Sequence, residues 1–168
     1  MNAKKLSELA MLSGTALIIF VIELRLPDLS AIQGVKLGLA NIITVYAVYK
    51  YSAKEVLLIV LTRVLLGSVF SGNPAALIYS LAGALTCLGG MLAVKKVIPV
   101  NYIWLCSMIG AVLHNIGQIT AAFAVTRTAA VFASLPILII SGCIAGLFTG
   151  ICAKIVVRRN IRRRESDD

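Results

Sequence analysis

The chain has 168 residues, of which 60% are hydrophobic and 14% are charged, and its mean hydropathy is +0.96. Soluble domains are about 45–50% apolar and about 25% charged, so this composition excludes an ordinary soluble domain. The formal net charge of +9 would suit a nucleic-acid-binding protein as well as a membrane protein. The distribution of the basic residues decides between these two classes.

Long apolar stretches predict six transmembrane helices joined by short loops. They cover residues 5–26, 35–51, 53–71, 74–94, 98–125 and 130–157, and each is long enough for a hydrocarbon core of about 30 Å. The first stretch follows MNAKK like a secretory signal, but it is long and lacks a small-x-small cleavage site, so we expect it to remain as a helix. We predict an all-α integral membrane protein with a six-transmembrane-helix domain over residues 1–157 and a basic, polar tail over residues 158–168.

Basic residues gather on one side of this predicted topology. With six spans both termini share a side, and that side carries 12 of the 16 basic residues, against 3 in the opposite loops. The positive-inside rule therefore places both termini in the cytoplasm. The tail RRNIRRRESDD is then a topology anchor against anionic lipid, with docking to a cytoplasmic partner as the alternative.

Arg63 is a lone charge in the apolar run LLIVLTRVLLGSVF of the 53–71 helix. A charge at that depth costs about 2.5–3.5 kcal/mol on insertion scales, so we expect it to face a protein interior or a watery cavity. Two other interpretations remain open. The side chain can reach the outer interface, or it can pair with Glu23 near the end of the first helix.

Polar residues of the other predicted helices fall in the same outer half. They are Asn41, Ser80, His114, Asn115 and Gln118, with Asn73 in the loop that follows the 53–71 helix. At about 100° per residue, Asn115 and Gln118 lie within about 100° of His114, and Ala111 and Ala122 fall in the same arc. Together with Arg63 these residues predict a ligand site that opens to the outside. The alternative is a set of hydrogen bonds that join the helices.

Small residues four positions apart indicate close helix packing. They are Gly142, Gly146 and Gly150 in the sixth helix, Gly34 and Gly38 in the second, and Ala10 and Gly14 in the first. We expect the second and sixth helices to pack within the bundle and the first to contact another subunit. The four cysteines, at 87, 106, 143 and 152, have unrelated spacings, so we expect packing roles and no metal site.

Four stretches, in this order, carry a family resemblance: VKLGLANIITVYAVY (35–49), RVLLGSVFSG (63–72), SLAGALTCLGG (80–90) and GAVLHNIGQ (110–118). They resemble the Gx transporter family, also named heptaprenyl diphosphate synthase component I. That family is similar to the six-helix substrate-binding S components of energy-coupling-factor (ECF) transporters. The resemblance covers about residues 5–157, and RVLLG and HNIGQ are its most specific blocks.

The resemblance implies a subunit of an ECF-type ABC importer in a bacterial cytoplasmic membrane. Such a subunit captures a small molecule from outside, and a transmembrane coupling subunit with paired cytoplasmic ATPases drives its release inward. S components dock to the coupling subunit through alanines four apart on the first helix. The resemblance thus implies docking at Ala10 and Gly14, where Gly14 departs from the pattern.

The inventory of motifs argues against catalysis by this chain. It has no GxxxxGK[ST] phosphate loop, so we expect no ATP hydrolysis, and no acidic residue sits mid-membrane as a proton or sodium carrier. None of its seven acidic residues forms the DDxxD array that would hold the magnesium ions of a prenyl diphosphate. We expect no cofactor. The alternative function is a non-catalytic membrane component of a heptaprenyl or polyprenyl diphosphate synthase, and a small channel is disfavoured by the apolar inner halves.

Overall fold

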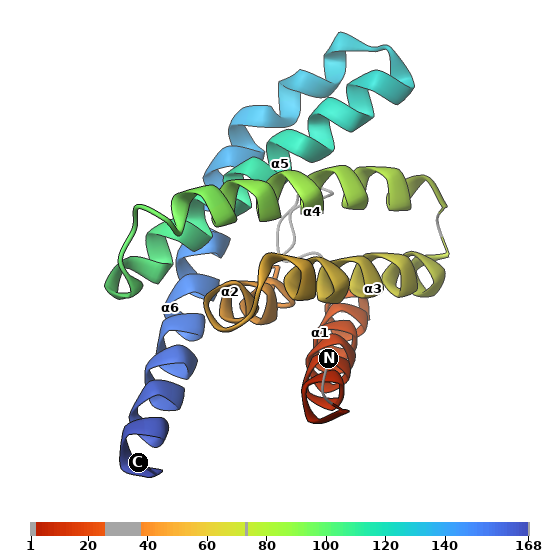
Figure 1. The fold of residues 1–168 in the computed structure, drawn as a ribbon. Helices are drawn as coiled ribbons and strands as arrows, with labels where there is room; N and C mark the ends of the chain where they lie inside the picture. Colours follow the sequence, from red (N-terminus) through yellow and green to blue (C-terminus); the bar gives the residue numbers. More distant parts are fainter. Residues whose placement is uncertain (1–2, 26–37, 73, 168) are drawn as a thin grey trace.

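The described part of the chain is all-helical. The computed structural model describes residues 3–25, 38–72 and 74–167, with the side chains of 74–76 and 161–167 left out. In these residues it has six α-helices, two short 3-10 helices and no strands (Figure 1). They are α1 (Ala3–Arg25), α2 (Asn41–Lys50), α3 (Ala53–Ser71), α4 (Pro74–Val94), η1 (Val100–Tyr102), α5 (Ile103–Thr126), η2 (Ala129–Ser134) and α6 (Leu135–Asp167). The predicted bounds of the 53–71 and 74–94 helices are confirmed.

Four of the described helices, α1, α4, α5 and α6, are long and apolar enough to cross a membrane. The α3 helix has 19 residues but carries Lys54, Glu55 and Arg63. The all-α class is therefore confirmed, together with four helices of spanning length and composition.

The second helix is shorter than the sequence predicts. A single helix over 35–51 is wrong, because α2 begins at Asn41 and has 10 residues, or about 15 Å at 1.5 Å per residue. Gly38 adopts a left-handed conformation with φ of 65°, and its N–H donates to the Glu23 side chain. Such a residue ends any helix that precedes it. The expected Gly34/Gly38 helix face is not formed, since Gly38 lies ahead of α2 and Gly34 lies outside the described residues.

Glycines allow α5 to pack closely on both of its neighbours. Against α4, a Cβ added at Gly117 would lie 2.9 Å from the Ala82 carbonyl oxygen. Against α6, a Cβ at Gly146 would lie 2.6 Å from the Cα of Met108, and one at Gly150 would lie 2.5 Å from the Cα of Trp104. The expectation that the small-residue face of the sixth helix packs within the bundle is confirmed, with α5 as its partner.

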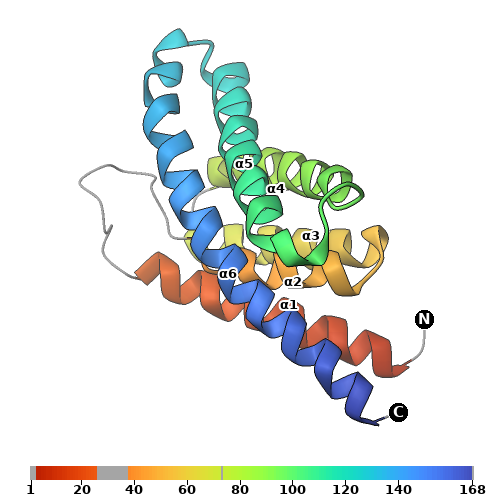
Figure 2. The ribbon, with the colours of Figure 1, turned by 90° about the vertical axis from the view of Figure 1, so that its left-hand side faces the viewer.

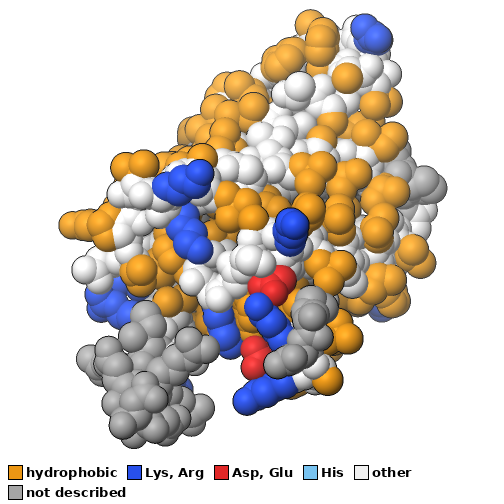
Figure 3. Space-filling view, in the orientation of Figure 1, with side chains coloured by type: hydrophobic (Ala, Val, Ile, Leu, Met, Phe, Trp, Pro, Cys, Tyr) orange, Lys and Arg blue, Asp and Glu red, His pale blue; other side chains and the backbone are white. Residues whose placement is uncertain are grey.

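Charged side chains tie the N-terminal half of α1 to the connection between α2 and α3. The Lys5 ammonium lies 2.6 Å from a Glu55 carboxylate oxygen, and Glu55 also accepts the Ser52 N–H at the start of α3. Glu8 accepts the Tyr51 hydroxyl at 2.7 Å. On the face seen in Figure 3, the Asp and Glu side chains lie in the lower part beside several Lys and Arg, whereas the upper part is a mixture of hydrophobic and other uncharged groups with Lys or Arg at its tip.

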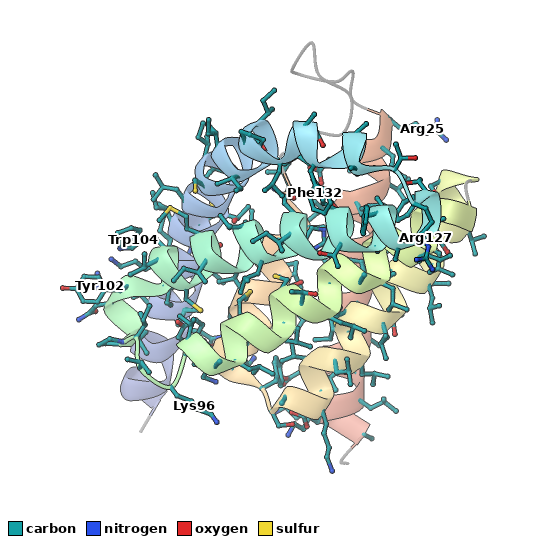
Figure 4. All side chains as sticks on the ribbon, turned by 90° about the horizontal axis from the view of Figure 1, so that it is seen from above. Arg25, Lys96, Tyr102, Trp104, Arg127 and Phe132 are labelled. Carbon is teal, nitrogen blue, oxygen red and sulfur yellow. The ribbon has the colours of Figure 1, made fainter. Side chains whose placement is uncertain are left out.

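The bundle has two distinct ends. Figure 4 shows Arg25 and Arg127 at one end, and Lys96, Tyr102 and Trp104 at the other. The N-terminal end of α1 and the C-terminal end of α6 lie on the same side of the molecule (Figure 2). The α6 helix continues to Asp167, so the predicted polar tail over 158–168 is an extension of the last helix through residue 167.

Candidate functional site

A cavity of about 510 Å³ lies in the half of the bundle towards Arg25 and Arg127, and all six α-helices contribute to its wall. Its size is within the range of small-molecule pockets, about 300–1,000 Å³. Apolar residues from α1, α3, α5 and α6 form part of the wall. The polar and charged lining residues are Glu23, Asn41, Arg63, Ser68, Ser71, Tyr79, Ser80, His114, Asn115, Gln118, Ser134, Ser141 and Thr149.

Arg63 lies on α3 with its guanidinium towards α2. The residue is only 8% exposed, and its Nη1 donates to the Asn41 Oδ1 at 2.9 Å. That bond uses one of the five N–H donors of an arginine. No carboxylate of the described residues lies within 4.0 Å of Arg63, so the alternative of an ion pair with Glu23 is not formed. Its burial likewise argues against a side chain that extends to the interface.

Glu23 completes the same side of the cavity. It is 8% exposed near the end of α1, and its Oε1 accepts the N–H of Gly38. Gly38 in turn accepts the Asn41 N–H at 2.8 Å, in the turn that begins α2. The carboxylate therefore fixes the turn that places Asn41, and Asn41 holds Arg63. Sequence reasoning named Glu23 only as a partner for Arg63 and missed this contact with the backbone.

His114 lines the cavity from α5, where the helix passes close to Gly83 of α4. A Cβ on Gly83 would lie 3.1 Å from the His114 Cε1 and 2.7 Å from the Gln118 Cγ. The glycine thus gives both side chains the space they occupy beside α4. The buried Nδ1 of His114 has no hydrogen-bond partner among the described residues. Gln118, Ser80 and Tyr79 also line this part of the cavity.

Asn115 uses its amide to join α5 to α6. Its Nδ2 donates to the backbone carbonyl of Leu138, while the Ser107 and Thr149 hydroxyls of the same two helices lie 3.0 Å apart. Hydrogen bonds of this kind between membrane helices are worth about 0.6 kcal/mol each. Asn115 therefore forms a hydrogen bond that joins two helices, which was the alternative interpretation, and it also lines the cavity.

A second, small cavity of about 10 Å³ adjoins the first and shares Asn41, Ala111 and Thr149 with its wall. This is close to the lower limit for one buried water molecule. Thr44 lines it with a hydroxyl that has no partner among the described residues. The rest of its wall is mixed, with Ser107 beside the apolar Val45, Cys87 and Met91.

The structure brings six of the seven residues predicted to bind a ligand to one cavity: Asn41, Arg63, Ser80, His114, Asn115 and Gln118. The seventh, Asn73, lies outside the described residues. The two residues predicted for partner docking lie on the outside of α1, where Ala10 is exposed and no atom would lie within 4 Å of a Cβ at Gly14.

Two contributions to the wall escaped the sequence analysis. Tyr79 stands directly before Ser80 in an apolar span, and its phenol was not considered. On α6, Ser141, Ala145 and Thr149 recur every fourth residue, a spacing that places them on one helix face. That face lines the cavity, and the spacing was the available signal.

The fold and the cavity define a class: a multi-pass α-helical membrane protein with a polar, partly charged pocket inside its bundle. The family follows from comparison of the sequence. A family model described as heptaprenyl diphosphate synthase component I matches residues 12–156, and the chain belongs to this family. A search of curated proteins gave no match, and a search of solved structures gave none either.

Proposed function

We propose that this chain is the substrate-binding subunit of an ECF-type importer, which captures a small molecule in the cavity around Arg63. The observation that carries the proposal is a buried arginine that has one acceptor among the described residues and lines a cavity of about 510 Å³. An ionised side chain inside a membrane protein is a pointer to a binding site or pathway. Arg63 lines this cavity, so a ligand within it can accept from the guanidinium.

In the proposed topology the chain crosses a bacterial inner membrane six times, and both termini lie on the cytoplasmic side. The charges of Lys5, Lys50, Lys54 and Lys96 support the orientation by the positive-inside rule. The cavity would accordingly open to the outside. Fusion of a reporter after residue 168 tests this: a cytoplasmic reporter should be active and a periplasmic one inactive.

The proposal assigns the exposed side of α1 around Ala10 and Gly14 to a transmembrane coupling subunit. Both residues are small, and neither is covered by another described helix. Small residues allow helices to approach closely in lipid. Paired cytoplasmic ATPases would supply the energy, because this sequence has no phosphate loop with which to hydrolyse ATP.

The family description favours a second candidate, a non-catalytic membrane component of a heptaprenyl diphosphate synthase. A prenyl diphosphate also has an anionic end for Arg63 and an apolar chain. Affinity purification of the tagged chain from its native membranes separates the two candidates. Coupling and ATPase subunits should co-purify if the importer proposal is right. A soluble prenyl synthase in their place would favour the second candidate.

Uptake supplies an independent test of the importer. Cells that carry the wild-type chain with its partners should accumulate a compound from the medium. Cells that carry the Gly14→Leu variant should not accumulate it, because a leucine would hold the coupling helix away from α1. Leu6 is also exposed on α1, so Leu6→Ala serves as a control that leaves the small-residue positions intact. Equal uptake by the Gly14→Leu variant would count against docking at this face.

A further inference from the structure

Two opposite charges line the cavity without direct contact between them. Arg63 and Glu23 are each 8% exposed and both contribute to the same wall, yet they do not lie within 4.0 Å of each other. Each instead holds one neutral group of the described residues: Arg63 the Asn41 carbonyl oxygen, and Glu23 the Gly38 N–H. This separation leaves the cavity with a positive and a negative site.

Both side chains keep most of their hydrogen-bonding capacity. An arginine has five N–H donors and an ionised carboxylate has about four acceptor positions, and the described residues supply one bond to each. Buried charges are stable only when they are paired and hydrogen-bonded. Both residues line the cavity, so a compound bound there can supply further partners to each.

We infer, on the basis of the proposed function, that the compound bound in this cavity is zwitterionic. Its anionic group binds Arg63 and its ammonium or other cationic N–H group binds Glu23. The wall of the same cavity also includes Phe20, Val64 and Ile119, which suit an apolar body. The fixed turn at Gly38 keeps the two sites at a constant separation, because Glu23 holds that turn and Asn41 follows it.

The two charges also exclude other ligand classes. A purely anionic compound on Arg63 takes that cation away from the Glu23 carboxylate, and the carboxylate repels the compound. A purely cationic compound on Glu23 does the same to Arg63. Like charges and unpaired buried charges are the usual means by which a site rejects the wrong ligand.

The test uses the full chain in lipid nanodiscs and a cell extract separated by ion exchange into anionic, cationic, neutral and zwitterionic pools. The midpoint of thermal unfolding is measured with each pool for the wild type, Arg63→Gln and Glu23→Gln. Gln at 23 can still accept the Gly38 N–H, so that turn is kept. Glu8→Gln, at the opposite end of the same helix, is the matched control, and variants are compared only if they elute like the wild type.

The zwitterionic pool alone should raise the unfolding midpoint of the wild type and of Glu8→Gln. Arg63→Gln and Glu23→Gln should each need about 30-fold more of that pool for half-maximal stabilisation, the effect of losing one buried charge contact. If the anionic, cationic or neutral pool stabilises the wild type and stabilises Glu23→Gln equally, the zwitterion inference is overturned. The importer proposal would still stand. No stabilisation of the folded wild type by any pool would contradict the proposed function itself.

Discussion

Gly150 is the position where the packing of α5 on α6 predicts the sharpest loss of stability. In Gly150→Ala the new Cβ would lie 2.5 Å from the Cα of Trp104 and 2.8 Å from the Cβ of Ser107. Ordinary carbon–carbon contacts are about 3.5–4.0 Å, so the two helices must separate by about 1 Å. The nearest atom belongs to the backbone and cannot move away by rotation of a side chain.

Two terms set the magnitude of this loss. Overpacking of a tight interface costs about 1–3 kcal/mol, and separation of the helices weakens the contact between the Ser107 and Thr149 hydroxyls, worth about 0.6 kcal/mol. The higher helix propensity of Ala offsets at most about 1 kcal/mol. We expect a net loss of about 1–3 kcal/mol in the free energy of unfolding.

Gly89 on α4 provides the matched control, because it is exposed and a Cβ there meets no atom within 4 Å. Thermal unfolding in detergent should place Gly89→Ala at or above the wild type. Gly150→Ala should unfold about 2–12 °C below the wild type, at about 2–4 °C per kcal/mol for a chain of this size, and at least as far below Gly89→Ala. Equal midpoints for the two variants would refute the close approach of α5 and α6 on which the cavity wall rests.

Three further predictions concern separate parts of the molecule. Gly38→Ala strains a residue at φ of 65° and brings a Cβ to 3.3 Å from the Asn41 Nδ2. It should lower the free energy of unfolding by about 1–2 kcal/mol and also weaken ligand binding. Normal ligand binding would show that the turn does not place Asn41. Glu55→Gln removes the contact with Lys5 and should leave both the unfolding midpoint and ligand binding nearly unchanged, because an exposed ion pair contributes little. A clear fall in the midpoint would mean that this contact holds α1 in place. Cys106 is fully buried, so a membrane-permeable maleimide should modify it only after the protein unfolds. Mass spectrometry of the labelled chain can show this. Fast labelling of Cys106 in the folded protein would contradict the packing around it.

The position of the cavity was predictable because polar side chains are rare in apolar spans. Arg63, His114 and Gln118 stand out in the sequence, and the alternating direction of the helices places them at one level. Geometry within α5 was also accessible, since the helical repeat alone relates Gln118 to His114. The structure adds Asn41 as the acceptor that orients Arg63.

The beginning of α2 could not be predicted from hydropathy. Residues 35–51 read as one apolar stretch, but the turn at Gly38 depends on a hydrogen bond to Glu23, which is 15 positions away in the chain. A contact of that kind has no local sequence signal. The helix of the sixth predicted span continues beyond residue 157, because the segment after it is rich in Arg, a good helix former, and contains neither Gly nor Pro.

The division of labour among the polar residues was also beyond the sequence. Asn115 and Gln118 are both amides on one arc of α5, yet Asn115 donates to the Leu138 carbonyl, whereas no bond to Gln118 is formed within the described residues. The difference arises because α6 approaches α5 closely at Gly142, where a Cβ would lie 2.7 Å from the Asn115 Nδ2. Which of two neighbouring amides serves packing depends on this tertiary contact.

The central claim is that Arg63 holds a small molecule in this cavity, and the most direct measurement is of what the purified protein carries. Wild type, Arg63→Gln and the exposed control Arg127→Gln are purified gently from the same cells, and small molecules released by denaturation are quantified by mass spectrometry. One compound should accompany the wild type and Arg127→Gln in near-equal amount and be absent from folded Arg63→Gln. The same compound at the same amount in all three proteins would contradict the claim.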